Sequence, residues 1–137
     1  MGRKIALDTN VFVYALEDDG KLGEEARKLF DRIKRGNTKA YTSSITIHEV
    51  LTGVYKKGNE EDIPDYLRAI SGGDEVKIAD FTTEVAIISA RIRVAYKLKT
   101  PDAIQIGTAI ALGASRFVTF DKRIPRNIEG LKVEVLG

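Results

Sequence analysis

The sequence predicts a single α/β domain built around a parallel sheet. Short apolar runs alternate with longer segments in which apolar residues recur at helical spacing, a pattern typical of repeated strand–helix units. Two of the short runs end on an acid, since Ile5–Leu7 leads into Asp8 and Phe117–Phe120 leads into Asp121. The chain has 137 residues and contains no linker or internal repeat, so we expect residues 1–137 to form one domain.

The first half of the chain is predicted to contain two strands and four helices. Thr9 or Asn10 follows the first strand as a helix cap, and Ser43 or Ser44 does the same after the second strand. Gly36 follows a helical pattern and is a C-cap signal. The predicted elements are strand 4–8, helix 10–17, helix 23–34, strand 39–42, helix 44–57 and helix 62–71.

The second half is predicted to contain three strands and two helices. Gly72-Gly73 breaks the preceding helix, and Gly113 closes a later one. Pro101 directly after Thr100 indicates a helix start, with the threonine as cap and the proline in the first turn. The predicted elements are strand 75–79, helix 82–98, helix 100–112, strand 116–119 and strand 132–135.

Composition excludes several classes of protein. The chain has no cysteine, which excludes a disulfide framework, a thiolate metal site and a cysteine nucleophile. No apolar run approaches the roughly 18–20 residues of a membrane span, and the run before Asp8 is too short for a signal peptide. We therefore expect a cytoplasmic protein. The net charge of +2, from 22 basic and 20 acidic residues, permits nucleic-acid binding without requiring it.

Asp8 and Glu49 are candidate functional acids that also have ordinary structural explanations. In a parallel sheet, ligands bind at the carboxyl ends of the strands, where Asp8 is expected. Asp8 could simply be a turn residue, but because Asn10 can cap the next helix, we predict that the Asp8 side chain faces the crevice. Glu49 lies between apolar positions of helix 44–57, at the border of buried surface. The lone His48 beside it is expected to be packed or solvated.

Asp102 and Asp121 can each be explained locally as well. An acid in the first turn of a helix is favoured by the helix dipole by roughly 0.3–1 kcal/mol, which accounts for Asp102. Asp121 could be a turn residue. If the acids converge, however, two carboxylates about 4 Å apart repel by roughly 4 kcal/mol at an effective dielectric near 20. A divalent cation would remove this repulsion, and oxygen-only ligands suit Mg²⁺ or Mn²⁺ better than zinc.

Four motifs in a fixed order identify a family resemblance. They are Asp8-Thr9-Asn10, Glu49 on a helix, Pro101-Asp102-Ala103 and Thr119-Phe120-Asp121. In length, element order and spacing of these acids, essentially the whole chain resembles the PIN-domain ribonucleases, and most closely the VapC-type toxins of toxin–antitoxin pairs. The resemblance implies a PIN-like three-layer α/β/α sandwich with a parallel sheet of about five strands.

The resemblance also implies a reaction and a site. A Mg²⁺- or Mn²⁺-dependent endoribonuclease would hydrolyse RNA phosphodiesters through four carboxylates. Asp8, Asp102 and Asp121 would hold the metal directly or through water, and Glu49 would complete the pocket through water. Asn10 and Thr119 would orient these ligands or the waters of the metal. The choice between one metal and two stays open. A small antitoxin and a homodimer are the partners that the family implies.

Basic and aromatic residues near the pocket are candidates for RNA contacts. Each could bind phosphates or stack on bases, and each could equally belong to an ordinary solvated or packed face. The basic candidates are Lys56, Lys57, Lys97, Lys99 and Arg123, with Lys122 and Arg126 also considered, and the aromatic candidates are Tyr14 and Tyr55.

Other functions remain as alternatives. The chain could be an RNA-processing PIN nuclease that is not a toxin, although a single domain of this length favours the toxin. It could also be a non-catalytic PIN-like module that binds RNA or protein. A haloacid-dehalogenase-like phosphatase is disfavoured because Asn10 stands where a second aspartate is needed. A response-regulator receiver is disfavoured because its acidic pair and late lysine are missing.

Overall fold

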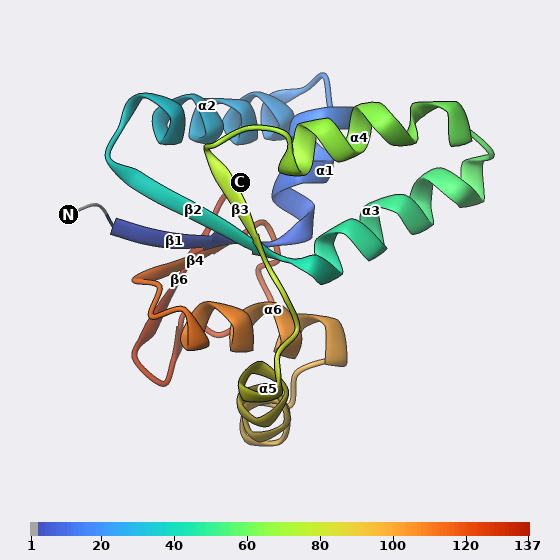
Figure 1. Cartoon of the computed structure of the whole chain (residues 1–137). Coiled ribbons are helices and arrows are strands. Elements are labelled where there is room, and N and C mark those ends of the chain that lie inside the picture. The colour runs from blue at the N-terminus through green and yellow to red at the C-terminus, as the bar shows by residue number, and fades with distance from the viewer. Residues whose placement is uncertain (1–2) are drawn as a thin grey trace.

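The computed structural model describes residues 3–137 and shows alternating strands and helices (Figure 1). The strands are β1 (Arg3–Leu7), β2 (Thr38–Ser43), β3 (Val76–Ala79), β4 (Arg116–Thr119), β5 (Asn127–Ile128) and β6 (Leu131–Val135). The helices are α1 (Thr9–Glu17), α2 (Lys21–Arg35), α3 (Ser44–Lys57), α4 (Ile63–Ser71), α5 (Thr83–Tyr96) and α6 (Thr100–Ala111), with a short 3₁₀ turn at Glu60–Asp62.

The strands form one sheet in the order β3-β2-β1-β4-β6-β5. Every neighbouring pair is parallel except β5 and β6, which form an antiparallel hairpin. The predicted parallel sheet of five strands is therefore confirmed, with β5 as an added sixth strand. Sequence pattern could not reveal β5, because two residues are too few to show an alternating periodicity.

Helices cover both faces of the sheet, which gives the predicted three layers. Alternate residues of β1 point to opposite faces, so Ile5 and Leu7 pack with α1, α2 and α4, while Ala6 packs with α5 and α6. Figure 1 shows α5 and α6 on one side of the sheet and the other helices on the opposite side. Both faces are thus buried, as a parallel sheet requires.

Several helix boundaries differ from the prediction for local reasons. Helix α5 ends at Tyr96 rather than at residue 98, because Lys97 adopts the left-handed conformation at φ 56°. Lys99, not Thr100, is the N-cap residue of α6, and it makes no side-chain cap. Ser43 is the cap of α3, and its hydroxyl accepts the Ile45 N–H. No helix within residues 3–137 is long and apolar enough to cross a membrane.

The register of the central strands positions the two strand-terminal motifs. Leu7 pairs with Val118 in the parallel ladder of β1 and β4. The next backbone group, Asp8 N–H, then donates to the Val118 carbonyl at 2.9 Å. Asp8, which directly follows β1, and Thr119, the last residue of β4, consequently lie side by side at the carboxyl edge of the sheet.

Candidate active site

Asp8 lies at the junction of β1 and α1 and is 6% exposed. One carboxylate oxygen, Oδ1, accepts the Thr9 N–H at 2.8 Å, which makes Asp8 the N-cap of α1. The other oxygen, Oδ2, accepts the Thr119 hydroxyl at 2.7 Å. The expectation that Thr9 or Asn10 would cap α1 and leave Asp8 free is therefore wrong. Asp8 caps the helix and lines the crevice at the same time, because its two oxygens point to different partners.

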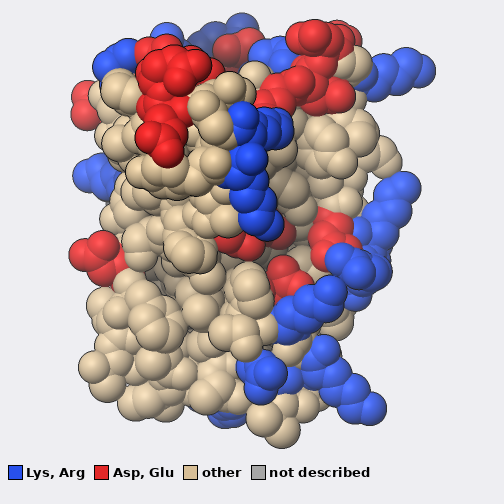
Figure 2. All heavy atoms as spheres, turned by 90° about the vertical axis from the view of Figure 1, so that its right-hand side faces the viewer, with Lys and Arg blue, Asp and Glu red and all other residues tan. Residues whose placement is uncertain are grey.

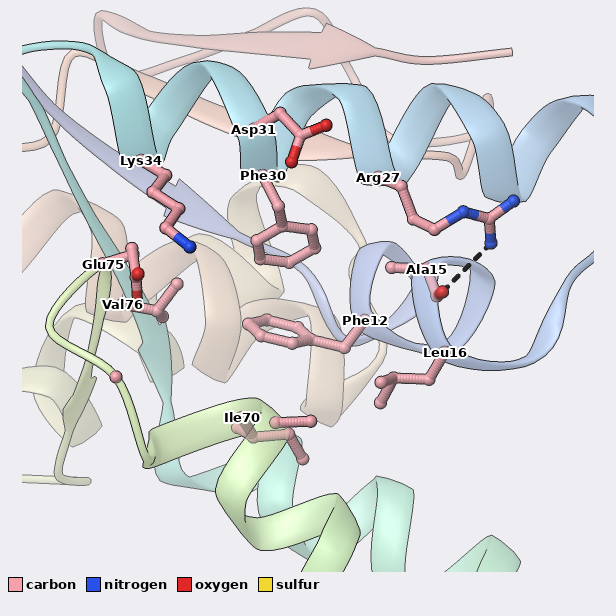
Figure 3. A pocket seen from close by; sticks show the side chains of 12 residues that line it. Phe12, Ala15, Leu16, Arg27, Phe30, Asp31, Lys34, Ile70, Glu75 and Val76 are labelled. Carbon is pink, nitrogen blue, oxygen red and sulfur yellow. Dashed lines mark hydrogen bonds between the residues drawn. The ribbon is translucent and has the colours of Figure 1, made fainter.

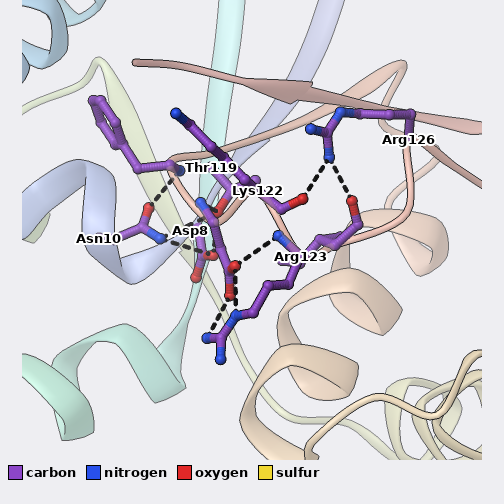
Figure 4. Close-up of polar contacts among 9 residues, drawn as sticks. Asp8, Asn10, Thr119, Lys122, Arg123 and Arg126 are labelled. Atoms are coloured by element: carbon purple, nitrogen blue, oxygen red, sulfur yellow. Dashed lines mark hydrogen bonds and ion pairs between the residues drawn. The ribbon is translucent and has the colours of Figure 1, made fainter.

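Asn10 and Thr119 join α1 to the end of β4. Asn10 lies inside α1, where its Nδ2 donates to Thr119 Oγ1 at 3.1 Å and its Oδ1 accepts the Phe120 N–H at 3.1 Å. Thr119 Oγ1 also accepts the Asp121 N–H at 3.0 Å. The two residues predicted to support the acids thus lie between Asp8 and Asp121, and Thr119 holds the Asp8 carboxylate and the backbone of Asp121 (Figure 4).

The other three acids come from separate elements. Glu49 is half-buried on α3, and its Oε1 accepts the Thr9 hydroxyl at 2.6 Å. Asp102 is half-buried in the first turn of α6. Asp121 follows β4, and both of its carboxylate oxygens accept hydrogen bonds from the Arg123 guanidinium, at 3.0 and 3.1 Å.

All four acids line one open pocket at the carboxyl edge of the sheet. Its remaining lining residues are Thr9, Asn10, Val13 and Tyr14, and its volume is about 410 Å³. Figure 2 shows acidic side chains recessed in the middle of this face, with basic side chains along one side of the hollow. The structure therefore brings together all the acids that the sequence singled out.

The shared pocket raises the pKa of two of its acids. Burial raises the pKa of Asp8 to about 7, with smaller increases from Asp102 and Glu49, and hydrogen bonds from Thr119 and Thr9 oppose these effects. Burial, and then the charges of Asp121 and Glu49, raise the pKa of Asp102. Asp121 behaves in the opposite way, because its hydrogen bonds with Arg123 lower its pKa. Asp8 and Asp102 in the inner part of the pocket therefore keep their protons to a higher pH than free carboxyl groups do, and Asp121 does not.

The chemistry of these donors fits a hard divalent cation, since every acid presents oxygen and the pKa of two of them is raised, mainly by burial and also by neighbouring carboxylates. Their present arrangement is not a finished metal site. Within the part of the chain that the structure describes, no three His, Asp or Glu side chains are placed so as to hold one ion. Asp121 is turned toward Arg123, and Asp8 toward the Thr9 backbone N–H and the Thr119 hydroxyl.

The candidate RNA contacts separate into two groups. Lys97, Lys99 and Arg123 line a second hollow of about 220 Å³, which shares the walls Asp102 and Asp121 with the acidic pocket. Lys56 and Lys57 line neither hollow, and Lys57 forms an ion pair with Glu17 at 3.3 Å. The first group is therefore next to the acids, and the second is not.

The other candidates for RNA contacts, Arg126, Tyr14 and Tyr55, differ in how far their side chains are held by neighbouring residues. Arg126 donates to the carbonyls of Lys122 and Ile124, which fixes the loop after β4. Tyr14 packs against Phe120 with ring centroids 4.6 Å apart, whereas Tyr55 is 56% exposed. The single histidine, at position 48, is exposed and does not line the acidic pocket.

Sequence reasoning missed a group of polar residues beneath the acids. Thr9, Thr46 and Gln105 form a hydrogen-bonded cluster that reaches Glu49. Gln105 is 2% exposed. The available signal was that Gln105 interrupts the apolar run Ala103–Ile106 three residues after Asp102, where an amide needs buried partners.

Comparison with known proteins agrees with this geometry. The model of the PIN domain family matches residues 5–129. No curated protein matched the sequence. Among solved structures, a toxin–antitoxin complex from Klebsiella pneumoniae is similar at 25% identity over 93% of this chain and 94% of that one, with a TM-score of 0.68.

Two further solved structures share the fold at lower identity. VapBC2 from Rickettsia felis, bound to a DNA fragment from its promoter, has 22% identity over 98% of this chain and 99% of that one, with a TM-score of 0.74. VapC20 from Mycobacterium tuberculosis, a sarcin–ricin loop cleaving toxin, has 12% identity over 82% and 86%, with a TM-score of 0.67.

Proposed function

The chain belongs to the PIN domain family, and from this premise we propose that it is a Mg²⁺- or Mn²⁺-dependent endoribonuclease and the toxin of a toxin–antitoxin pair. The observation that carries the proposal is the convergence of Asp8, Glu49, Asp102 and Asp121 on one pocket. The similarity to toxin–antitoxin complexes supports the toxin assignment. One protein of the same fold cleaves the sarcin–ricin loop, which makes RNA the first substrate to test.

Each residue of the pocket has a proposed task. Asp8, Asp102 and Asp121 hold the cation, and Glu49 completes the site through water. The cation supplies Lewis-acid stabilisation of the charge that develops on the phosphodiester. Asn10 and Thr119 hold Asp8 and the backbone of Asp121 in register. Lys97 and Lys99, in the adjoining hollow, attract the neighbouring phosphates of the RNA.

We assign the antitoxin to a groove on the opposite side of α1. This groove, of about 280 Å³, has an apolar floor that includes Phe12, Leu16, Phe30 and Ile70 (Figure 3). Leu16 is 41% exposed there, and charged side chains such as Arg27 line the groove as well. An amphipathic segment suits such a groove. Because α1 also lines the acidic pocket through Val13 and Tyr14, a partner bound in the groove lies near the active site.

A homodimer is the second proposed assembly, and α5 offers the surface for it. Ile87 and Val94 are 63% and 76% exposed. They are seven residues apart, so they share one face of the helix. Figure 1 shows α5 as the outermost element of its layer. A second copy would remove these apolar side chains from water.

RNA cleavage in the presence and absence of metal tests the function. A panel of structured and unstructured RNAs should be cut with Mg²⁺ or Mn²⁺, should stay intact with EDTA, and should stay intact with the folded Asp8→Asn variant. Asp80→Asn is the matched control, because Asp80 also directly follows a strand, β3, but is exposed and does not line the pocket. Full activity of Asp8→Asn would refute the mechanism.

Two further outcomes separate the alternatives. Expression without a partner should arrest growth if the protein is a toxin, whereas harmless expression of an enzyme active on RNA would identify a processing nuclease. Failure of the purified protein both to cleave RNA and to bind Mn²⁺ would leave the non-catalytic binding module as the better assignment.

A further inference from the structure

A buried polar cluster connects the three helices that carry Asp8, Glu49 and Asp102. The Gln105 amide on α6 donates to Thr9 Oγ1 on α1 at 2.9 Å and to Thr46 Oγ1 on α3 at 2.8 Å. Thr46 and Gln105 are 0% and 2% exposed, so these groups have no access to bulk water. Such groups are stable only when their donors and acceptors are matched.

The number of hydroxyl and amide hydrogens determines which group donates in each hydrogen bond of the cluster. The Thr42 hydroxyl donates to the Leu7 carbonyl at 2.8 Å, so the 2.6 Å contact between Thr42 and Thr46 must use the hydrogen of Thr46. Both hydrogens of the Gln105 amide are used as well, one on Thr46 and one on Thr9. The Thr9 hydroxyl therefore has one hydrogen left to give.

The Thr9 hydrogen goes to Glu49. Thr9 Oγ1 lies 2.6 Å from Glu49 Oε1 and 3.2 Å from Thr46 Oγ1. The Thr46 hydrogen is already committed, and a carboxylate is the stronger acceptor. The Gln105 amide thus keeps a lone pair of Thr9 occupied and leaves its hydroxyl to donate toward the pocket. The orientation of the Glu49 carboxylate depends on this arrangement.

The positions of these residues relative to the acids are equally specific. Thr9 directly follows Asp8, Thr46 precedes Glu49 by three residues, and Gln105 follows Asp102 by three residues. Residues three apart on a helix lie close together, so Glu49 and Asp102 each reach the pocket about one turn from a residue of the cluster, and Asp8 is next to one in the chain. A purely apolar core at this position would pack the helices but would not fix their rotation relative to one another.

We propose that Gln105 is a positioning residue of the active site, which acts through Thr9 to orient Glu49 toward the metal. This inference rests on the proposed function, since it assumes that the acidic pocket takes a divalent cation. Partners of metal ligands commonly change metal affinity by 10–100-fold when they are removed. Gln105 touches neither the metal nor the RNA, so its effect is expected in cation affinity before it is expected anywhere else.

The test compares Gln105→Met with Thr108→Val. Methionine has nearly the length of glutamine but no amide hydrogens. Thr108 is also on α6 and is 1% exposed, and its hydroxyl donates to the Ile104 carbonyl of its own helix at 2.7 Å. Both variants lose buried hydrogen bonds, and we expect both to lower the denaturation midpoint. Mn²⁺ affinity, measured by calorimetry without RNA, should fall about tenfold in Gln105→Met and stay unchanged in Thr108→Val.

A double-mutant cycle tests whether Gln105 affects Mn²⁺ affinity through Thr9. Thr9→Val keeps the shape of the side chain and removes the hydroxyl, so it should lower Mn²⁺ affinity by itself, and adding Gln105→Met should lower it no further. Additive losses would overturn the proposed action through Thr9. If Gln105→Met does not fold, Thr9→Val alone decides, and unchanged Mn²⁺ affinity in that variant overturns the proposal.

Measurements on the wild-type protein distinguish a failure of the role proposed for Gln105 from a failure of the proposed function. If the wild type binds Mn²⁺ and cleaves RNA, while Gln105→Met binds Mn²⁺ as tightly as Thr108→Val, the positioning role of Gln105 is wrong and the proposed function stands. If the wild type neither binds Mn²⁺ nor cleaves RNA, the proposed function is wrong and the role assigned to Gln105 falls with it.

Discussion

Arg123 binds both carboxylate oxygens of Asp121. Its Nε lies 3.0 Å from Oδ1 and its Nη2 lies 3.1 Å from Oδ2, and its backbone N–H also donates to Oδ1 at 2.9 Å. Asp121 is a proposed metal ligand, and Arg123 is a candidate RNA contact. Each therefore uses, in contact with the other, the atoms that would bind a cation or an RNA phosphate.

Replacing Arg123 should strengthen the binding of Mn²⁺ and weaken the binding of RNA. Arg123→Ala frees Asp121, so Mn²⁺ should bind about two- to fivefold more tightly, a modest gain because the Arg123 side chain is 78% exposed. RNA should bind more weakly, and the slope of log affinity against log salt should shrink by about 0.7 for a single-stranded RNA. Calorimetry with Mn²⁺, and fluorescence anisotropy with RNA in EDTA, measure these two effects.

Arg91→Ala is the matched control for that experiment. Arg91 is also an exposed arginine that binds a carboxylate through two nitrogens, Nε and Nη2, but its partner is Glu129 and it lines neither the acidic pocket nor the adjoining hollow. Arg91→Ala should change neither the Mn²⁺ affinity nor the RNA affinity. A loss of Mn²⁺ affinity in Arg123→Ala would mean that Arg123 helps to build the metal site rather than competing with it.

Stability without metal should fall as pH rises, because of Asp8. Its pKa is raised from 3.8 to about 7 in the folded state, so the folded protein holds a proton that the unfolded chain releases. The stabilisation is fully present below about pH 4 and is lost as pH rises through about 7, at a cost of about 4 kcal/mol at most. Asp8→Asn, which resembles the protonated acid, should lack this component.

Urea denaturation in EDTA at several pH values between 5 and 8 measures the difference. Wild type should lose stability relative to Asp8→Asn across this range, and Mn²⁺ should restore it in wild type alone at pH 8. Parallel stability profiles for the two proteins would show that Asp8 titrates normally.

The Thr119 hydroxyl should control the pH at which metal binds. It donates to Asp8 Oδ2 and thereby lowers the pKa of Asp8 against the effect of burial. Thr119→Val should raise that pKa further, so the pH midpoint of Mn²⁺ affinity should move upward. Stability should fall by about 1–3 kcal/mol, because Asn10 Nδ2 and the Asp121 N–H lose their acceptor. Thr108→Val serves again as control and should leave the pH midpoint unchanged.

A charge on the outer face of α5 should prevent the proposed homodimer. Val94→Glu places a carboxylate among the exposed apolar side chains of that face, and light scattering after size exclusion should then give the mass of one chain. Leu16→Glu is the control, because Leu16 is also exposed and apolar but lies in the groove beside α1 and α4. A wild-type protein that is monomeric at high concentration would contradict the dimer itself.

The sequence by itself determined the elements and the identity of the acids. Apolar periodicity marks a strand or a helix within a few residues, and the strand-terminal Asp8 and Asp121 follow from that spacing because parallel strands end at one edge. The four ordered acids were sufficient to identify the family. The elements and the single motifs are local properties, since each depends on residues that are neighbours in the chain, and the family follows from the order of the motifs.

Only the tertiary structure decided how the side chains are used. Asp8 caps α1 where Asn10 seemed the better candidate, because Asn10 reaches instead across to the end of β4. Gln105 and Thr9 are 96 residues apart in the chain and meet only in the folded protein, where α6 and the start of α1 come together from opposite faces of the sheet. Hydrogen-bond partners, burial and the resulting pKa shifts depend on distances between separate elements, and residue spacing along the chain does not contain those distances.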